Sequence, residues 1–416
     1  MSSDSLQFPK NWHQITLGEL ITFKRGHDLP IKKRKLGKYP IVASNGIVDF
    51  HNEYKAKGPG VTIGRSGNLG KPIFIKEDYW PLNTTLYSID FHGSSPKFVY
   101  YFLKTLPLHE LNSGSAVPTL NRNYIHPLDI IVPKNHLEQV KIAKVLSDLD
   151  GKIELNNQMN KTLKAIGQAI FRHWFVHFEF PDENGQPYKT CGGEMVDSEL
   201  GEIPVGWEVG KLGDLLKIGI GGDWGEDEEF DDSVKVVCLR GVDLQRLKET
   251  GYSAEAPTRW ISKSSLIKRE LTNCDVLIGA SGLGPVGRSL YFSYAIKNIY
   301  FDSIIYSNFC KRLTAKLPEN AIYAERFIEY FYNRGGIESY VTGTSIPNLD
   351  TKGLMNLEII IPPLNLIKIY SDLLDKEYVQ LYKSESQQLS QIRDSLLPKL
   401  MSGKIRVKIT EEATAK

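Results

Sequence analysis

The stretch KFVYYFLKTLPLHELNSGSAVPTL (residues 97–120) returns 229 residues later as RFIEYFYNRGGIESYVTGTSIPNL (residues 326–349). The two stretches align without a gap, and six of their positions are identical. The register continues from LDIIVP (residues 128–133) to LEIIIP (residues 357–362). A repeat of this length indicates a duplicated domain, in which each copy buries its own core. The sequence therefore predicts two copies of one fold.

The two copies also begin alike, although their interiors differ in length. Trp12 and the ITLGELI that follows it correspond to Trp207 and GKLGDLL, at an offset of 195 residues. Because the offset reaches 229 at the later match, the interior of the second copy is 34 residues longer. We predict a first domain at residues 1–135, a helical segment at 136–180, a linker at 181–203, a second domain at 204–363, a second helical segment at 364–403 and a tail at 404–416.

The bulk composition agrees with a two-domain globular protein. A chain of 416 residues exceeds the usual size of one core, and 41% hydrophobic with 24% charged residues is typical of globular chains. The start, MSSDSLQFPKNW, lacks the regions of a signal peptide, and no apolar run is long enough to cross a bilayer. The four cysteines contain no CxxC pair, so we expect a reduced, cytoplasmic protein without structural zinc or disulfides.

A long helix is predicted after each copy. No proline occurs from residue 135 to residue 178, and a heptad seam with polar interruptions runs through Ile142, Leu146, Leu149, Ile153, Asn156, Asn160, Leu163, Gly167, Ile170 and Trp174. A rougher seam follows the second copy and is expected to end at Pro398, through Ile369, Leu373, Tyr378, Leu381, Gln388, Ile392 and Leu396. The helices should span about 44 and about 37 residues, or roughly 66 and 55 Å. They should pack on each other, with the asparagines fixing the register, or each on its own domain.

The first helical segment ends in the aromatic run FRHWFVHFEF (residues 171–180). We expect this run to complete a hydrophobic core or a subunit contact rather than a catalytic site. His173 and His177 lie four residues apart, but the glutamate of an HExxH motif and a third ligand are missing. The pair is therefore expected at packing or surface positions, and no metal site is predicted.

Charge is unevenly distributed along the chain. Up to residue 134 there are 17 Lys/Arg against 10 Asp/Glu, and IKKRKLGK (residues 31–38) forms a concentrated basic loop. Such a cluster either neutralises nucleic-acid phosphates or is simply a solvated loop. The second half carries the acidic run GEDEEFDD (residues 225–232), which DNA would repel and which should therefore lie away from it.

Two glycine-rich loops resemble nucleotide cradles without meeting their requirements. VTIGRSGNLGK (residues 61–71) has five residues where a Walker A loop has four, and Pro72 follows its lysine. VLIGASGLGPVGR (residues 276–288) contains GxGxxG, but aromatic and β-branched residues typical of strands follow it, where a dinucleotide site needs a helix. Neither loop is therefore predicted to bind a nucleotide.

No enzymatic motif is complete elsewhere in the chain. An ExK triplet at residues 53–55 lacks a partner in the second copy, and neither a methyltransferase NPPY-like motif nor a GxSxG elbow occurs. We therefore predict a binding protein that is not an enzyme.

Two related modules at a fixed separation suit DNA with two half-sites. In the glycine loops, glycine allows close approach, arginine can read guanine and asparagine can read adenine.

The order of these features resembles the specificity subunit of type I restriction–modification systems. The resemblance rests on the loop VTIGRSGNLGK, the segment SGSAVPTLNRNYI with the later LDIIVP that leads into a long helix, and their second copies, from Trp12 to about Ile405. It implies an α+β fold with two duplicated β-rich target-recognition domains. Two long helices would separate them as an antiparallel coiled coil with a pseudo-twofold arrangement. Each domain would read one half of a bipartite double-stranded DNA target.

The resemblance also implies partners. The helices would set the spacer and dock two methyltransferase subunits, and motor–nuclease subunits would complete the complex. S-adenosylmethionine, ATP and Mg²⁺ would then belong to those partners, with no cofactor in this chain. An alternative function is a coiled-coil scaffold whose two β-modules bind protein partners.

The candidate DNA contacts rest on both lines of reasoning. The first domain would use Lys32, Lys33, Arg34 and Lys35 as phosphate binders, with Arg65, Ser66, Asn68 and Lys71 at the glycine loop and Arg122 near the helix junction. The second domain would use Arg240, Arg259, Ser281 and Arg288.

Overall fold

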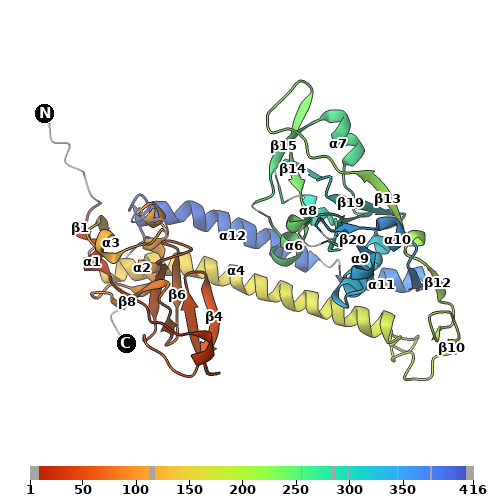
Figure 1. The fold of residues 1–416 in the computed structure, drawn as a ribbon, viewed down its shortest axis with the longest axis horizontal. Coiled ribbons are helices and arrows are strands. Elements are labelled where there is room, and N and C mark those ends of the chain that lie inside the picture. Colours follow the sequence, from red (N-terminus) through yellow and green to blue (C-terminus); the bar gives the residue numbers. More distant parts are fainter. Residues whose placement is uncertain are drawn as a thin grey trace. The chain divides into compact units, whose positions relative to one another are not determined.

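The computed structural model divides into two compact units, each containing one copy of the repeat (Figure 1). The structure describes residues 9–111, 118–253, 255–282, 286–297, 299–300, 302–343, 345–374 and 377–408. Unit 1 is Met1–Ile153 with Leu389–Lys416, and unit 2 is Glu154–Gln388. Both long helices, α4 (His136–Phe171) and α12 (Glu377–Met401), therefore contribute residues to both units.

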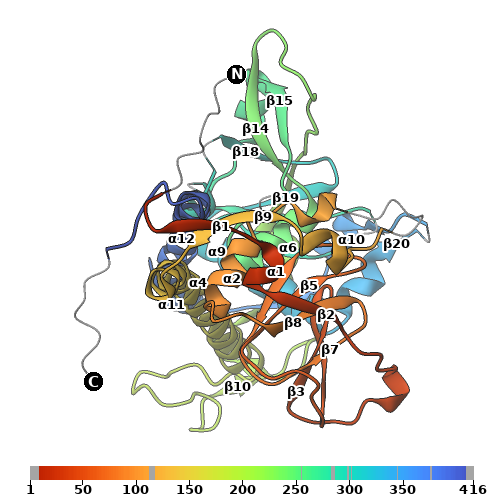
Figure 2. The ribbon, with the colours of Figure 1, turned by 90° about the vertical axis from the view of Figure 1, so that its left-hand side faces the viewer.

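The first domain contains three sheets. A four-stranded antiparallel sheet has the order β2 (Thr22–Arg25), β8 (Thr85–Asp90), β5 (Gly60–Gly64) and β6 (Pro72–Ile75). A three-stranded sheet places β3 (Tyr39–Ala43) antiparallel to β4 (Gly46–His51) and parallel to β7 (Trp80–Pro81). A third pair joins the ends of the domain, β1 (Trp12–Thr16) and β9 (Asp129–Pro133). Figure 2 shows β3 and β7 lying away from α1 (Leu17–Leu20) and α2 (Pro96–Leu103).

The second domain repeats this topology strand for strand. Its antiparallel sheet has the order β13 (Leu216–Gly221), β19 (Cys310–Ala315), β16 (Asp275–Gly279) and β17 (Ser289–Tyr291). In its three-stranded sheet, β14 (Ser233–Leu239) is antiparallel to β15 (Thr258–Ser262) and parallel to β18 (Ser303–Tyr306). Its ends are joined by β12 (Glu208–Lys211) and β22 (Glu358–Ile361). The antiparallel pair β14 and β15 projects from the rest of the domain (Figure 2).

The short helices correspond as well, and local sequence explains where they begin. α1 matches α5 (Leu212–Leu215): the backbone N–H of Thr16 donates to Glu19 (2.7 Å) and that of Lys211 donates to Asp214 (2.6 Å), which satisfies an N-terminal amide. Proline opens both α2 and its counterpart α9 (Pro318–Asn333), where a missing amide hydrogen costs nothing. α3 (Arg122–Ile125) corresponds to α10 (Thr351–Met355).

The longer interior of the second copy adds helices rather than strands to the sheets. These are α6 (Gly241–Thr250), α7 (Lys263–Arg269) and α8 (Tyr294–Lys297). The remaining short elements are η1 (Ile31–Lys33), η2 (Leu108–Glu110) and η4 (Gly336–Tyr340), and the strand pairs β10 (Met195–Val196) with β11 (Ile203–Pro204) and β20 (Val341–Thr342) with β21 (Asn348–Leu349). Extra length between corresponding strands leaves the sheet order unchanged.

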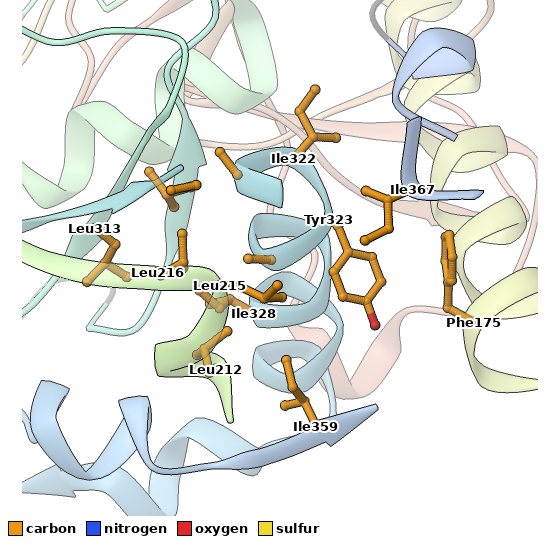
Figure 3. Close-up of a cluster of buried hydrophobic side chains, with 14 of the residues drawn as sticks. Phe175, Leu212, Leu215, Leu216, Leu313, Ile322, Tyr323, Ile328, Ile359 and Ile367 are labelled. Atoms are coloured by element: carbon orange, nitrogen blue, oxygen red, sulfur yellow. The ribbon is translucent and has the colours of Figure 1, made fainter. Parts of the chain in front are cut away.

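Each domain closes its core with residues of the long helices. In unit 1, Ile142, Ala143 and Leu146 of α4 share a hydrophobic cluster with Leu400 and Met401 of α12. In unit 2, residues from α5, α9 and α11 (Leu364–Leu374) share one hydrophobic cluster with Phe175, which lies just beyond α4 and beside Tyr323 and Ile367 (Figure 3). The prediction that the aromatic run completes a core is confirmed, since the buried aromatics are Phe171, Phe175 and Phe178. His173 and His177 are exposed, as expected.

The first long helix is shorter than predicted. After the 36 residues of α4, a π-helical turn follows, η3 (Arg172–Val176), and Phe178 adopts a left-handed backbone conformation with φ 62°. That conformation costs a non-glycine residue roughly 1–2 kcal/mol. The Phe178 ring packs edge-on against Trp207 at 5.5 Å, and burial of the ring offsets this cost. The helix therefore ends where the aromatic side chains enter the core.

Within each unit the long helical segments contact each other. In unit 1, Arg393 of α12 donates to Asp150 of α4 (2.6 Å). In unit 2, Asn156 of α4 donates to Glu385 of α12 (2.7 Å), and the Tyr370 hydroxyl donates to the Gly167 carbonyl (3.0 Å). None of the ten residues predicted for the first seam is exposed, so the segment buries the predicted face. Ile142 and Leu146 pack into the core of unit 1, and Ile170 and Trp174 pack against the core of unit 2.

The second predicted seam is wrong at four of its seven positions, since Ile369, Leu373, Gln388 and Ile392 are exposed. Leu396 packs half-buried against the core of unit 1, as predicted, and the side chains of Tyr378 and Leu381 lie outside the described part of the chain. Ile369, Leu373 and Ile392 are 49%, 40% and 47% exposed, whereas the buried face includes Tyr370, Ser371, Ser386 and Leu400. Serines on the buried face hide the seam from a search for apolar residues. Pro398 does not end the helix, because α12 continues to Met401 and the burial of Leu400 and Met401 holds the last turn in place.

Candidate nucleic-acid interface

The first glycine loop is held by a set of backbone hydrogen bonds. The Gly64 amide donates to the Lys71 carbonyl (3.3 Å) and the Gly70 amide to the Gly64 carbonyl (2.9 Å), which closes the loop. The Arg65 amide donates to Thr84 (2.8 Å), and the Leu120 amide donates to the Arg65 carbonyl (2.8 Å). A Cβ atom at Gly64 would lie 1.7 Å from the Asn68 carbonyl oxygen, so only glycine fits there.

The second glycine loop has the same hydrogen bonds. The Gly279 amide donates to Arg288 (2.9 Å), the Gly287 amide to Gly279 (2.8 Å) and the Leu349 amide to Ala280 (2.8 Å). Isolated bridges also correspond, Ser66 with Thr119 and Ser281 with Asn348. By this correspondence Ala280 stands in the place of Arg65, and Arg288 in the place of Lys71.

The strand after each glycine loop excludes a nucleotide cradle. β6 comes directly after the first loop and β17 after the second, so neither loop opens a helix whose N-terminus could face a pyrophosphate. The prediction of strands after the second loop is confirmed by β17 and β18, although α8 lies between them. The three residues 283–285 of the GxGxxG match lie outside the described residues.

Three of the candidate side chains on the first loop are available to a ligand. Asn68 and Lys71 are exposed, and Arg65 is partly exposed while its backbone is fixed by Thr84 and Leu120. Ser66 is partly exposed and bridges Thr119 through its backbone. Side chains on a fixed backbone lose little further entropy when they bind.

The two ends of β4 lie next to this loop and next to the basic loop at residues 31–38. At one end of β4, a Cβ atom on Gly67 would lie 3.2 Å from the Ser44 hydroxyl, so the turn between β3 and β4 adjoins the glycine loop. At the other end, the Lys35 amide donates to His51 (3.0 Å). Six residues of strand span about 20 Å. We call the basic loop, β4 and residues 64–71 together the first-domain face.

The four basic candidates of the basic loop differ in their roles. Lys32, Lys33 and Lys35 are exposed, but Arg34 is 17% exposed and donates to Asp49 of β4 (3.2 Å). The Phe50 amide and Arg34 both lower the pKa of Asp49, which keeps that carboxylate ionised. Arg34 therefore holds the loop on β4. Arg122 is exposed and lies two residues beyond Leu120, with its Nη1 3.5 Å from the Phe23 carbonyl.

The two domains place opposite charges at one position of the fold. The basic loop lies between β2 and β3, and the acidic run at residues 225–232 lies between the corresponding strands β13 and β14. The ion pair to the edge strand is reversed as well: Arg34 pairs with Asp49 of β4, whereas Asp227 pairs with Arg259 of β15. Because Arg259 is paired with the acidic run, the prediction that this run lies away from DNA conflicts with the prediction that Arg259 contacts DNA.

The remaining candidates of the second domain are engaged in protein contacts. Arg240 donates to Asp243 (2.8 Å) and to the Glu255 carbonyl (2.7 Å). Arg259 also stacks on Trp224 at 4.2 Å. Arg288 donates to the Tyr332 hydroxyl (3.1 Å) and lines a cavity of about 310 Å³.

That cavity borders an ionic network that sequence reasoning missed. Glu329 of α9 accepts from Arg326 (2.9 Å) and lies 3.0 Å from Lys248 and 3.5 Å from Lys164. Burial alone would raise the pKa of Glu329, but Lys248 and Arg326 outweigh burial and hold it well below its usual range. Lys248 also pairs with the buried Glu325. In the sequence, the spacing of Glu325 and Glu329 by one helical turn is the one pattern that could have indicated this network.

Other classes of site find no support in the described part of the chain. No group of three His, Cys, Asp or Glu side chains there could hold a metal ion. None of the helices in that part is long and apolar enough to cross a membrane.

Comparison with known proteins identifies the family to which the chain belongs. Two stretches of the chain, residues 9–165 and 204–392, match the family described as type I restriction modification DNA specificity domain. The chain belongs to this family. The two matched stretches contain the two copies of the repeat, so this specificity subunit carries two recognition domains, as predicted.

Named relatives and a solved structure agree with this assignment. The chain is 28% identical over 344 residues to the type I restriction enzyme MjaIX specificity subunit of Methanocaldococcus jannaschii, covering 76% of this chain and 70% of that protein. It is 22% identical to the MjaVIII specificity subunit of the same organism, covering 97% and 95%. The crystal structure of the type I restriction-modification S subunit from M. genitalium has the same fold, with a TM-score of 0.60 and 17% identity over 97% of this chain and 99% of that one.

Proposed function

We propose that this chain selects a bipartite sequence in double-stranded DNA, with each recognition domain reading one half. The observation that carries the proposal is the recurrence of one hydrogen-bonded glycine loop in both domains of a DNA specificity family member. Backbone bonds fix the loop in each copy while its side chains differ. A fixed frame with variable side chains is what recognition of two different half-sites requires.

In the first domain, phosphate and base contacts are assigned to different parts of the first-domain face. Lys32, Lys33 and Lys35 are exposed cations suited to phosphates, which position the protein on the duplex. Arg65 and Asn68 have the donor and acceptor groups that distinguish guanine and adenine. The face spans about 20 Å, or roughly six base pairs at about 3.4 Å each, which suits one half-site.

The long helices are proposed to set the distance between the half-sites. α4 contributes Ile142 and Leu146 to the core of unit 1 and Phe171 to the core of unit 2, so it is built into both domains. We propose that α4 pairs with α11 and α12 as an antiparallel coiled coil with pseudo-twofold symmetry. The contacts of Asp150 with Arg393 and of Asn156 with Glu385 support this pairing.

Partner subunits are proposed to dock on the helices. Exposed apolar side chains on them include Leu155 (50%), Ile166 (49%), Ile369 (49%) and Ile392 (47%). Such side chains suit the burial that a stable protein interface provides. We propose that two methyltransferase subunits bind there and that motor–nuclease subunits join them in the cytoplasm. S-adenosylmethionine, ATP and Mg²⁺ would be bound by those subunits.

The test is salt-dependent binding of a duplex that carries the target, located by methylation mapping in the host. Removing one phosphate-binding lysine should reduce the slope of log K against log salt by about 1. We expect the triple variant Lys32→Ala/Lys33→Ala/Lys35→Ala to lower the slope by about 3. Replacing residues 1–135 with the first domain of another family member should change one half-site only. If the chain binds no duplex and captures a protein through its β-modules, it is instead a scaffold.

A further inference from the structure

The basic loop of the first domain presents an apolar side chain to solvent. Leu36 is 96% exposed, and no large apolar side chain among the described residues is more exposed. Ile31, at the start of the same loop, is 77% exposed. A single exposed apolar residue needs no explanation, but here Leu36 and Ile31 both lie exposed on one loop whose other long side chains are basic, and an apolar tip among cations suits a partner that is both charged and apolar.

The backbone on both sides of Leu36 is fixed. The Lys35 amide donates to the buried His51 (3.0 Å), and the Asn52 amide donates to the Lys35 carbonyl (3.1 Å). A Cβ atom on Gly37 would lie 2.3 Å from backbone atoms of Asn52, so the chain passes close to the end of β4. The backbone that carries Leu36 is therefore held at the end of β4.

The charge around Leu36 identifies the occupant. The loop IKKRKLGK carries five basic residues and no acidic one, and its arginine, Arg34, is bound to Asp49 of its own domain. A polyanion complements this surface. The loop is also continuous with the glycine loop through β4, so it lies on the face already assigned to DNA.

We propose that Leu36 is a wedge that inserts between adjacent base pairs of the first half-site while Lys35 and Lys38 hold the flanking phosphates. Insertion of an apolar side chain unstacks a base step and kinks the duplex by roughly 20–90°. The proposal rests on the DNA-reading function above and adds that the first half-site is distorted. Sequence preference then arises partly from how easily that step deforms.

The second domain is not assigned a wedge. Its loop at the same position carries the acidic run, in which Phe230 is 41% exposed and six residues are acidic. These carboxylates would be repelled by phosphates. The distortion is therefore expected in one half of the target only.

The test uses the full-length chain and its mapped target duplex, labelled with a dye pair at the ends of the first half-site. We expect the wild-type complex to show a bend by energy transfer. Leu36→Ala should abolish the bend and weaken binding roughly tenfold, because the leucine side chain is no longer buried in the duplex. The slope of log K against log salt should stay unchanged in Leu36→Ala. Lys35→Ala should reduce that slope by about 1 and keep the bend.

The matched control is Ile267→Ala in α7, which removes an isoleucine that is 76% exposed in the other domain. It should leave both bend and affinity unchanged. If wild-type binds its target and Leu36→Ala bends and binds it equally well, the wedge is wrong and DNA recognition stands. If Leu36→Ala instead loses a partner subunit with DNA binding intact, the side chain is a protein anchor and the wedge is also wrong. If wild-type itself binds no duplex, the proposed function fails first.

Discussion

Replacement of Glu329 by glutamine should loosen the second domain at its contact with α4. The Glu329 carboxylate interacts with Arg326 (2.9 Å), Lys248 (3.0 Å) and Lys164 (3.5 Å), and its side chain is only 10% exposed. Removing one member of a buried ion network costs about 3–5 kcal/mol when its partners stay uncompensated. Lys248 and Arg326 keep Glu325, and Lys164 is about one third exposed and can be hydrated. We therefore expect a loss of about 2 kcal/mol.

Differential scanning calorimetry of the full chain measures this loss. Unit 2 contains 235 residues, for which about 2 kcal/mol corresponds to a decrease in Tm of roughly 4–8 °C. The matched control is Glu255→Gln, because the Glu255 pair with Arg246 (2.6 Å) is exposed on both sides and such pairs contribute about 0–1 kcal/mol. A shift no larger than that of the control would refute the assigned network.

The pH dependence of Tm gives a second, independent test of the Glu329 ion network. Since the folded-state pKa of Glu329 lies below its ordinary value of 4.5, folding favours the carboxylate, and the stabilisation is complete above that value. It is lost as the pH falls through the folded-state pKa. The difference in Tm between wild-type and Glu329→Gln should therefore be constant near neutrality and shrink below pH 4.5. A difference that stays constant as the pH falls well below that value would contradict the depressed pKa.

Two further predictions concern recognition and spacing. Gly64→Ala should abolish reading of the first half-site, because its methyl group would meet the Asn68 carbonyl at 1.7 Å; Gly151→Ala in α4, where nothing lies within 4 Å, should leave recognition unchanged and can stabilise the helix by up to about 1 kcal/mol. Inserting seven residues into both α4 and α12 should lengthen the unread spacer by about 10.5 Å, or roughly three base pairs. Methylation mapping reports both results, and a spacer that does not change would refute the role of the helices in spacing.

The duplicated fold could be predicted because both copies of the repeat lie in one sequence and can be compared with each other. Gly64 and Gly279 keep glycine for a geometric reason, and the matching hydrogen bonds of the two loops follow from that. The buried face of the first long helix could also be predicted, because apolar residues such as Ile142 and Leu146 recur at regular intervals on that face. Patterns that repeat, in period or in copy, predict structure reliably because chance rarely repeats them.

The features that the sequence did not reveal depend on contacts between residues far apart in the chain. Ser371 and Ser386 occupy the buried face of the second helical segment, which no apolar pattern indicates. Lys164, Lys248 and Glu329 come from three separate elements and meet only in the folded domain. Likewise the ion pair between Arg34, a predicted phosphate binder, and Asp49 (3.2 Å) is a contact that the sequence pattern does not indicate. Sequence indicates which side chains carry charge, and the fold decides which charges remain available.

The reversed ion pair shows how one scaffold can hold two loops of opposite charge. Arg34 with Asp49 and Asp227 with Arg259 both tie a loop to its edge strand, so either arrangement satisfies the fold. The backbone bonds of the glycine loops are likewise independent of the side chains at Arg65 and Ala280. Because the contacts that hold the loops do not prescribe the charge they present, one fold accommodates loops of opposite charge. Under the proposed function, the specificity of one domain can therefore change while the fold of both domains is kept.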